Sequence, residues 1–205
     1  MMKTEILRTD QPGAFERALG ILREGGMVAF PTDTVYGLGT LAQDSQAIEQ
    51  LYIVKGRETA KAIAVMIGRA DDLAQAAQNM SEIARRLAER FWPGPLTLVV
   101  SRSPELPTNL SQMPTIGVRM PDHPAALDLL SRAGPMAVTS ANCSGGANTT
   151  TAQEVLDQLG GSIPLILDGG QTPGGLPSTV VDCTGSEPVI LRQGPITLEQ
   201  LKAAL

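Results

Sequence analysis

The sequence predicts an α/β protein with mixed α+β character, in which a twisted mixed sheet carries helices on its faces. Short apolar runs of strand length recur along the chain, and apolar residues at helical spacing separate many of them. Two strand-like runs near the end of the chain follow each other with no helix between them, which argues against a regular doubly wound parallel sheet. We find no linker or internal repeat, so we expect a single domain over residues 1–205.

The N-terminal part predicts a helix, a strand and a second helix. Apolar residues at helical spacing over 15–22 predict the first helix, which a pair of glycines ends. The apolar run at 27–30 is typical of a strand. Asp44 or Ser45 can cap the second helix, which should end near Lys55.

The rest of the chain continues this irregular alternation. Further strands are predicted at roughly 62–67, 96–100, 116–120, 136–139, 164–167, 179–182 and 188–191. Further helices are predicted at roughly 71–78, 81–91, 124–132, 152–159 and 197–204.

Charge and composition limit the classes of partner. Sixteen basic and 21 acidic residues give a net charge of −5, which is unfavourable for broad binding to phosphate backbones. Six aromatic residues are too few for an extended base-stacking platform. The chain shows no signal-peptide pattern and no apolar run of membrane-spanning length. We therefore expect a cytoplasmic protein with no DNA or membrane partner, and with Cys143 and Cys183 as ordinary thiols.

Five basic residues are candidates for an anion site. Lys55, Arg57 and Lys61 lie within seven residues near a predicted helix end, where a solvated charge cluster is the simpler interpretation. Arg119 and Arg192 each follow a predicted strand. Single cations at strand ends are common, so each of these is weak evidence by itself.

Three segments have small and hydroxyl-bearing residues suited to a phosphate cradle. Residues 139–146 directly follow a predicted buried strand, and the glycines there let a ligand approach backbone N–H groups. An ordinary turn rich in Asn, Ser and Gly is the alternative. Segments 31–37 and 177–182 pose the same choice.

The sequence does not match the usual patterns of dinucleotide-binding, Walker-type, catalytic-triad or zinc sites. Residues 37–42 fit a relaxed dinucleotide fingerprint, but six residues separate its glycines from the preceding strand. There is no Walker-type phosphate loop. His123 is the only histidine, and its place before Pro124 predicts a helix start better than a catalytic triad. One histidine and two distant cysteines cannot complete a zinc site.

Seven motifs in chain order carry a resemblance to a known family. They are PTDTVYGL at 31–38, KGR at 55–57, WPGPLT at 92–97, VRMPDHP at 118–124, TSAN at 139–142, STV at 178–180 and LR at 191–192. The chain resembles the YrdC-type threonylcarbamoyl-AMP synthases over roughly residues 25–192, in their short single-domain form. The resemblance implies a twisted sheet with a large concave pocket that holds nucleotide and threonine together.

The resemblance also implies the site residues. Four form the paired signature Lys-x-Arg and Ser-x-Asn and are expected to be catalytic: Lys55, Arg57, Ser140 and Asn142. Those expected at the nucleotide are Arg57, Lys61, Thr115, Asn142, Thr150 and Arg192. Those expected at threonine are Thr34, Arg119, Ser140 and Ser178.

The implied reaction is a nucleotidyl transfer. The threonine amine takes up bicarbonate or CO2 as an N-carboxylate, whose oxygen attacks the α-phosphorus of ATP and releases pyrophosphate. Converging cations would offset repulsion among these anions. Mg²⁺ is expected with ATP as co-substrate and carried by its phosphates. The product would supply N6-threonylcarbamoyladenosine modification at tRNA position 37, with tRNA engaged only through downstream transfer proteins.

Three positions depart from the family pattern and keep alternatives open. Glu58 and Ala62 stand where proline is usual, and Met66 stands where a histidine often helps to hold threonine. Met66 leaves room for a related carbamoyl-adenylating or transfer enzyme with another acceptor. A non-catalytic RNA-binding or ribosome-maturation factor is the second alternative, although the net charge counts against it.

Overall fold

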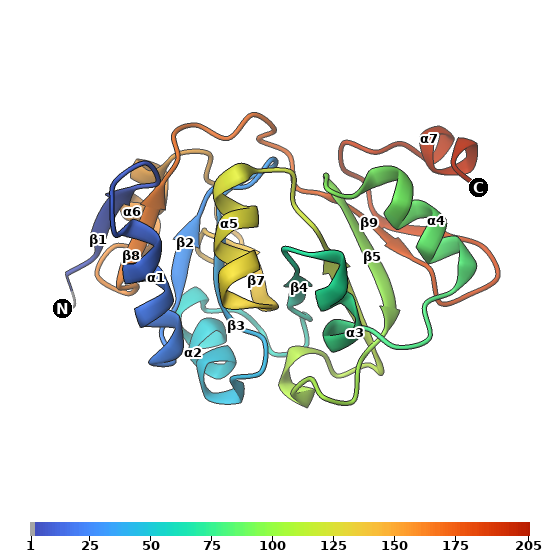
Figure 1. Ribbon diagram of the computed structural model, residues 1–205, viewed down its shortest axis with the longest axis horizontal. Coiled ribbons are helices and arrows are strands. Elements are labelled where there is room, and N and C mark those ends of the chain that lie inside the picture. The colour runs from blue at the N-terminus through green and yellow to red at the C-terminus, as the bar shows by residue number, and fades with distance from the viewer. Residues whose placement is uncertain (1–2) are drawn as a thin grey trace.

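A ten-stranded mixed sheet runs along the length of the molecule (Figure 1). The structure is a computed structural model that describes residues 3–205. The strand order is β1-β8-β2-β3-β7-β4-β6-β5-β9-β10. The strands are β1 Glu5–Arg8, β2 Val28–Phe30, β3 Gly37–Leu41, β4 Ala64–Met66, β5 Leu96–Ser101, β6 Thr115–Arg119, β7 Met136–Ser140, β8 Leu165–Asp168, β9 Thr179–Asp182 and β10 Val189–Arg192.

Helices cover parts of both faces of this sheet. They are α1 Ala14–Arg23, α2 Ser45–Lys55, α3 Leu73–Ala76, α4 Glu82–Phe91, α5 Pro124–Ala133, α6 Ala152–Leu159 and α7 Leu198–Ala203, with 3-10 turns η1 Ala70–Asp72 and η2 Thr108–Leu110. Side-chain caps fix several of their first turns. Asp44 accepts a hydrogen bond from the backbone N–H of Ala47 at the start of α2, and Ser81 caps α4 in the same way.

The strand pairings confirm the predicted mixed α/β fold. The pairs β1/β8, β2/β8, β4/β6 and β5/β9 are parallel, whereas β2/β3, β3/β7, β4/β7, β5/β6 and β9/β10 are antiparallel. The two closing strands, β9 and β10, pair directly with each other, as expected for strands without an intervening helix.

The helices pack into two core clusters. Residues of α1 and α5 pack with β2, β7 and β8 in one cluster, and in Figure 1 both helices lie on the viewer's side of the sheet. Residues of α2, α4, α6 and α7 pack in the other. Met66 and Val138 belong to the α1–α5 cluster and also line the main cavity. The cavity, described below, therefore opens on the same face of the sheet that α1 and α5 cover.

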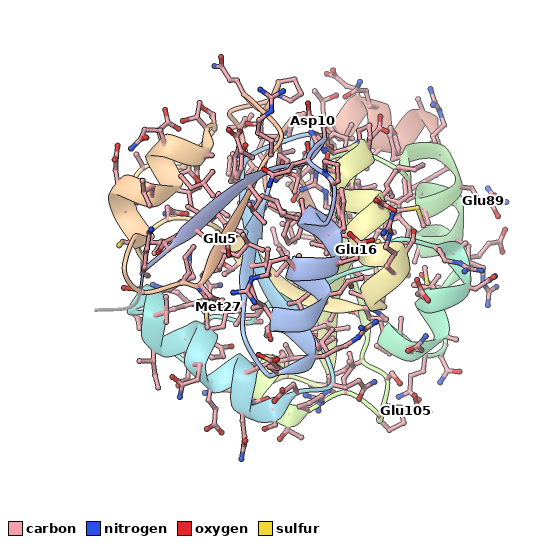
Figure 2. The ribbon with its side chains drawn as sticks, turned by 60° about the vertical axis from the view of Figure 1, so that its left-hand side comes forward. Glu5, Asp10, Glu16, Met27, Glu89 and Glu105 are labelled. Carbon is pink, nitrogen blue, oxygen red and sulfur yellow. The ribbon has the colours of Figure 1, made fainter. Side chains whose placement is uncertain are left out.

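Two exposed ion pairs link α1 to its neighbours, one to β1 and the other to α5. Figure 2 shows Glu5 on β1 and Glu16 on α1. Glu5 accepts a hydrogen bond from Arg17 at 3.1 Å, and Glu16 accepts one from Arg132 of α5 at 3.1 Å. These pairs are solvent-exposed, so each contributes little to stability. None of the helices within residues 3–205 is long and apolar enough to cross a membrane.

Two strands lie where the sequence analysis predicted none. The first, β1, is a short edge strand in which two apolar residues lie between charged ends. The second, β3, contains Gly37 and Gly39, and glycine is a poor strand former. A Cβ on either glycine would lie 2.9 Å from a methyl group of Val138 on β7, so only glycine allows this close approach. The predicted helix at 71–78 is also shorter, because η1 and α3 end at Ala76.

This packing predicts opposite effects for two glycine substitutions. Gly39→Ala would place a methyl group 2.9 Å from Val138 and 3.0 Å from Met136, and we expect a loss of about 1–3 kcal/mol in unfolding free energy. Gly20→Ala is the control, because nothing lies within 4 Å of its Cβ position in α1. We expect it to stabilise the protein by about 0.5–1 kcal/mol. Urea unfolding measures both, and equal effects would contradict the packing argument.

Candidate active site

Five neighbouring strands build the floor of the main cavity from alternate residues. The lining pairs are Ala64 and Met66 of β4, Thr97 and Val99 of β5, Gly117 and Arg119 of β6, Val138 and Ser140 of β7, and Ser178 with Val180 at β9. Residues two apart in a strand point to the same face of the sheet. The regular spacing therefore places all ten residues on one face, and the cavity lies over it.

Loops and strand ends complete the walls of this cavity. They contribute Thr32, Thr34, Val35, Tyr36, Gly37, Arg57, Ala62, Ile63, Thr139, Asn148, Pro177, Leu191 and Arg192. The cavity volume is about 380 Å³, within the range of small-molecule sites. Three of the lining residues are arginines and none is Asp or Glu, so the cavity favours an anionic ligand.

Arg119 is the most deeply fixed of the three arginines. It ends β6 with 3% of its surface exposed. Its Nε donates to the carbonyl of Gly94 at 3.0 Å, Nη1 donates to the Thr34 hydroxyl at 2.9 Å, and Nη2 forms an ion pair with Asp33. Burial lowers the pKa of Arg119, while the carboxylate of Asp33 raises it. The guanidinium therefore has one defined orientation.

Arg192 is anchored beside β9, at the edge of the floor. Its Nε and Nη2 donate to the backbone carbonyl of Ser178 at 3.1 and 2.8 Å, and Nη2 reaches the Ser178 hydroxyl at 3.1 Å. That hydroxyl also shares a 2.8 Å hydrogen bond with buried Thr97. Ser178 thus joins the N-terminal end of β9 to β5 and to the rim of the cavity.

Arg57 lies after the C-terminal turn of α2, which Gly56 ends with a left-handed backbone of φ 58°. Its Nε donates to the carbonyl of Lys61 at 3.0 Å and its Nη2 donates to that of Ala62 at 2.8 Å. Burial lowers the pKa of Arg192, and the nearby positive charge of Arg57 lowers it further. Two guanidinium groups that repel each other favour the binding of an anion between them, because the anion offsets that repulsion.

Lys55 supports the site from outside its lining. The residue is buried, and its ammonium donates to the backbone carbonyls of Ser140 and Asn142. The carbonyl of Lys55 in turn accepts the N–H of Ser144 at 2.9 Å. Burial, together with the charge of Arg57, lowers the pKa of Lys55 from 10.5 to about 8. These contacts hold the segment that follows β7 against the end of α2.

A second segment is fixed over Thr34. Buried Tyr36 donates its hydroxyl hydrogen to the carbonyl of Gly170 at 2.7 Å, and burial raises the pKa of Tyr36 to about 12. The N–H of Gly175 donates to the carbonyl of Thr34 at 2.8 Å. A Cβ on Gly174 would lie 2.8 Å from the carbonyl of Asp33, so glycine is required for this close approach. The loop after β8 therefore packs tightly on the 31–36 segment.

Six of the eleven residues expected at the site line this cavity. They are Thr34, Arg57, Arg119, Ser140, Ser178 and Arg192. Residues from positions 34 to 192 thus come together through the pairing of distant strands. Their individual roles remain predictions.

The other five lie outside the lining, and contacts within the protein explain their positions. Lys55 holds backbone carbonyls, and Asn142 donates its amide to the carbonyls of Cys143 and Gly146. Lys61 pairs with Glu58 at the surface, Thr150 donates its hydroxyl hydrogen to Glu154, and Thr115 pairs with Ser101 at the far end of β6. Direct ligand contact by these five stays a prediction.

Sequence reasoning missed three polar partners of the lining residues. Asp33 binds Arg119, Thr97 binds the Ser178 hydroxyl, and Thr32 shares a 3.0 Å hydrogen bond with the hydroxyl of Thr34. All three lie within motifs quoted above, at 31–38 and 92–97. Their positions within these motifs could have marked them as site residues. The contacts of Asp33 and Thr97, however, join segments that only the folded structure brings together.

The single histidine and the two cysteines lie outside the cavity lining. His123 is the N-cap of α5, where its Nδ1 accepts the N–H of Ala125 at 3.2 Å and Pro124 opens the helix. This confirms the helix start. Cys143 and Cys183 are both free thiols, and burial raises the pKa of Cys183 to about 12. Among residues 3–205 there is no group of three metal-ligating side chains.

Comparison with known proteins places this geometry in a family. The family model of the Sua5, YciO and YrdC proteins, described as "Telomere recombination", matches residues 20–194. The chain belongs to this family. Among solved structures, Escherichia coli YciO superposes with a TM-score of 0.85 at 30% identity, covering 98% of this chain and 100% of that one. The YrdC-like fold expected from the motifs is confirmed.

Relatives within the Sua5/YrdC family have informative names. Threonylcarbamoyl-AMP synthase of Bacillus subtilis is 42% identical, covering 98% of this chain and 59% of the relative. The Pyrococcus abyssi enzyme of that name is 42% identical, covering 92% and 56%. The structure of P. abyssi Sua5 complexed with L-threonine has a TM-score of 0.93 at 39% identity, covering 100% of this chain and 61% of that one. The chain thus spans a little over half the length of these relatives.

Proposed function

We propose that this chain is a nucleotidyltransferase that makes threonylcarbamoyl-AMP and pyrophosphate from L-threonine, bicarbonate or CO2, and ATP. One observation carries the proposal: three arginines and three hydroxyl side chains from six predicted positions converge on one cavity without a lining carboxylate. The reaction must bring a triphosphate, an amino-acid carboxylate and a carbamate together. A cavity of this charge offsets their repulsion. The names of relatives at about 40% identity give independent support.

We propose a role for each of these lining residues that is compatible with its position. Arg119 and Thr34 would hold the threonine carboxylate and hydroxyl, with Ser178 and Ser140 as further polar contacts. Arg57 and Arg192 would take the phosphates as planar, permanently charged forks. We propose single-domain organisation for the Sua5/YrdC-like unit at 1–205.

The chemistry needs no covalent enzyme intermediate. Bicarbonate condenses with the threonine amine to an N-carboxylate and loses water. One oxygen of that carbamate forms a bond to the α-phosphorus while the bond to the β-phosphate oxygen breaks, and pyrophosphate leaves. The protein contributes alignment and electrostatic stabilisation of the charge that develops on the phosphates.

Mg²⁺ belongs to the substrate in this proposal. The cavity lining offers hydroxyl groups and arginines but no carboxylate, a poor ligand set for a resident magnesium ion. We therefore propose that the ion enters on the phosphates of ATP and neutralises part of their charge. The proposed location is the cytoplasm, and tRNA would receive the threonylcarbamoyl group through downstream transfer proteins.

Pyrophosphate release tests the function. The purified chain is incubated with ATP, Mg²⁺ and bicarbonate, with and without L-threonine. We expect release that requires both threonine and bicarbonate, because the carbamate oxygen is the attacking nucleophile. Turnover that ignores threonine but responds to another amine would favour a different carbamoyl acceptor. Salt-sensitive RNA binding without ATP turnover would favour the non-catalytic alternative.

A further inference from the structure

We propose that Asp33, which lies outside the cavity lining, is the positioning residue for Arg119. By holding one edge of the guanidinium, Asp33 leaves a two-pronged donor facing the cavity for the carboxylate of the amino-acid substrate. The inference rests on the proposed function and deepens it, because it assigns how the carboxylate subsite is set.

The hydrogen bonds of Arg119 within the protein use three of its donors. A guanidinium has five N–H donors. Nε is committed to the carbonyl of Gly94, one Nη1 hydrogen to Thr34, and one Nη2 hydrogen to Asp33. One N–H on each terminal nitrogen therefore has no acceptor among residues 3–205. Arg119 lines the cavity, and two donors on one planar group match the two oxygens of a carboxylate.

Asp33 also connects two segments that lie far apart in the chain. Its Oδ1 atom accepts from Arg119 and also from the backbone N–H of Asp122 at 3.1 Å. Asp122 lies in the turn between β6 and α5, 89 positions along the chain from Asp33. Asp33 thus fixes the guanidinium and the strand end that carries it at the same time. Thr34, the next residue, binds the other terminal nitrogen.

The carboxylate of Asp33 is only partly satisfied by its neighbours. The Asp33 side chain is 11% exposed, and its Oδ2 atom is buried with no hydrogen-bond partner among residues 3–205. A neutral asparagine would supply the same Oδ1 acceptor to both N–H groups, so these hydrogen bonds alone do not require a negative charge. The negative charge is therefore superfluous for tying the turn. The charge instead stabilises the buried guanidinium of Arg119 and fixes its orientation.

Asp33→Asn separates these two roles, because it keeps the acceptor and removes the charge. We expect the dissociation constant of L-threonine, measured by calorimetry on the full chain, to rise roughly ten- to a hundredfold. Asp44→Asn is the matched control. Asp44 is also a half-buried aspartate that accepts a backbone N–H, but it caps α2 away from the cavity. We expect its affinity to stay within about twofold of wild type.

A double substitution tests whether Asp33 acts through Arg119. In the Arg119→Lys background, adding Asp33→Asn should weaken threonine binding by less than about threefold, because the planar fork is already lost. Additive losses in the double variant would overturn the proposal, since they would give Asp33 an effect independent of Arg119.

A ligand-free readout keeps the inference separate from the proposed function. In ¹⁵N NMR spectra, the Arg119 Nε–H signal should be sharp in the wild type and broadened or shifted in Asp33→Asn. If the wild type fails to bind L-threonine, the proposed function fails, and this signal still decides whether Asp33 orders Arg119. An unchanged Arg119 signal in Asp33→Asn would overturn the inference, whatever the affinity.

Discussion

Replacing Arg57 with alanine is expected to reduce threonine-dependent pyrophosphate release by roughly two to three orders of magnitude. Arg57 is a cavity-lining cation on the rim, fixed by the carbonyls of Lys61 and Ala62. These contacts use two of its five donors and leave the others for phosphate oxygens. Without it, Arg192 alone would have to offset the phosphate charge near the rim.

Two further variants make the Arg57 result specific. Arg57→Lys keeps the charge but loses the planar fork, so we expect it to recover only part of the rate. Arg85→Ala removes an exposed arginine from α4 and should leave turnover within about twofold of wild type. Circular dichroism and thermal unfolding check that each variant is folded. Near-normal turnover by Arg57→Ala would refute its role at the phosphates.

Replacing Lys55 is expected to damage both activity and stability, although its side chain lies outside the cavity. Lys55→Met has a similar length and no donor, so the carbonyls of Ser140 and Asn142 would lose their shared partner. We expect a loss of about 1–3 kcal/mol in unfolding free energy. Because Ser140 lines the cavity, turnover should fall by roughly two orders of magnitude. Lys202→Ala, in α7, is the control for a general loss of charge.

The pH dependence of stability gives an independent test of the Lys55 environment. Its pKa is about 8 in the folded protein and 10.5 when unperturbed, so between these values the unfolded chain binds more protons. Stability should therefore rise with pH across that window in the wild type relative to Lys55→Met. Urea unfolding of both proteins from pH 7 to 10.5 measures the difference. A flat difference would show that the ammonium has an unperturbed pKa.

Lys55 changes the interpretation of the paired signature at 55–57 and 140–142. The resemblance implied that all four residues are catalytic, with Arg57 and Asn142 at the nucleotide and Ser140 at threonine. In the structure, Arg57 and Ser140 line the cavity, while Lys55 and Asn142 bond to backbone around them. Half of the signature therefore contacts the cavity, and we interpret the other half as its support. A buried lysine is costly in free energy, so its presence here fits a need for a rigid backbone.

Local sequence signals were sufficient wherever an element is specified by its own residues. Asp44 caps α2 and Pro124 opens α5 because a side-chain acceptor, or a proline in the first turn, satisfies the local chemistry of a helix start. The β3 strand was not predicted for the converse reason. Its glycines have low strand propensity, and the residue that favours them, Val138, lies about a hundred positions away in the chain.

By itself, the sequence determined the α/β class, the starts of α2 and α5, and the motif residues that line the cavity. Those features depend on residue type, on spacing along one segment, or on a motif retained within a family. The tertiary structure alone decided that alternate residues of five strands face one cavity, that Asp33 holds Arg119, and that Lys55 supports rather than lines the site. These facts depend on strand register and on contacts 85 or more positions apart, and no local rule fixes such pairings in advance.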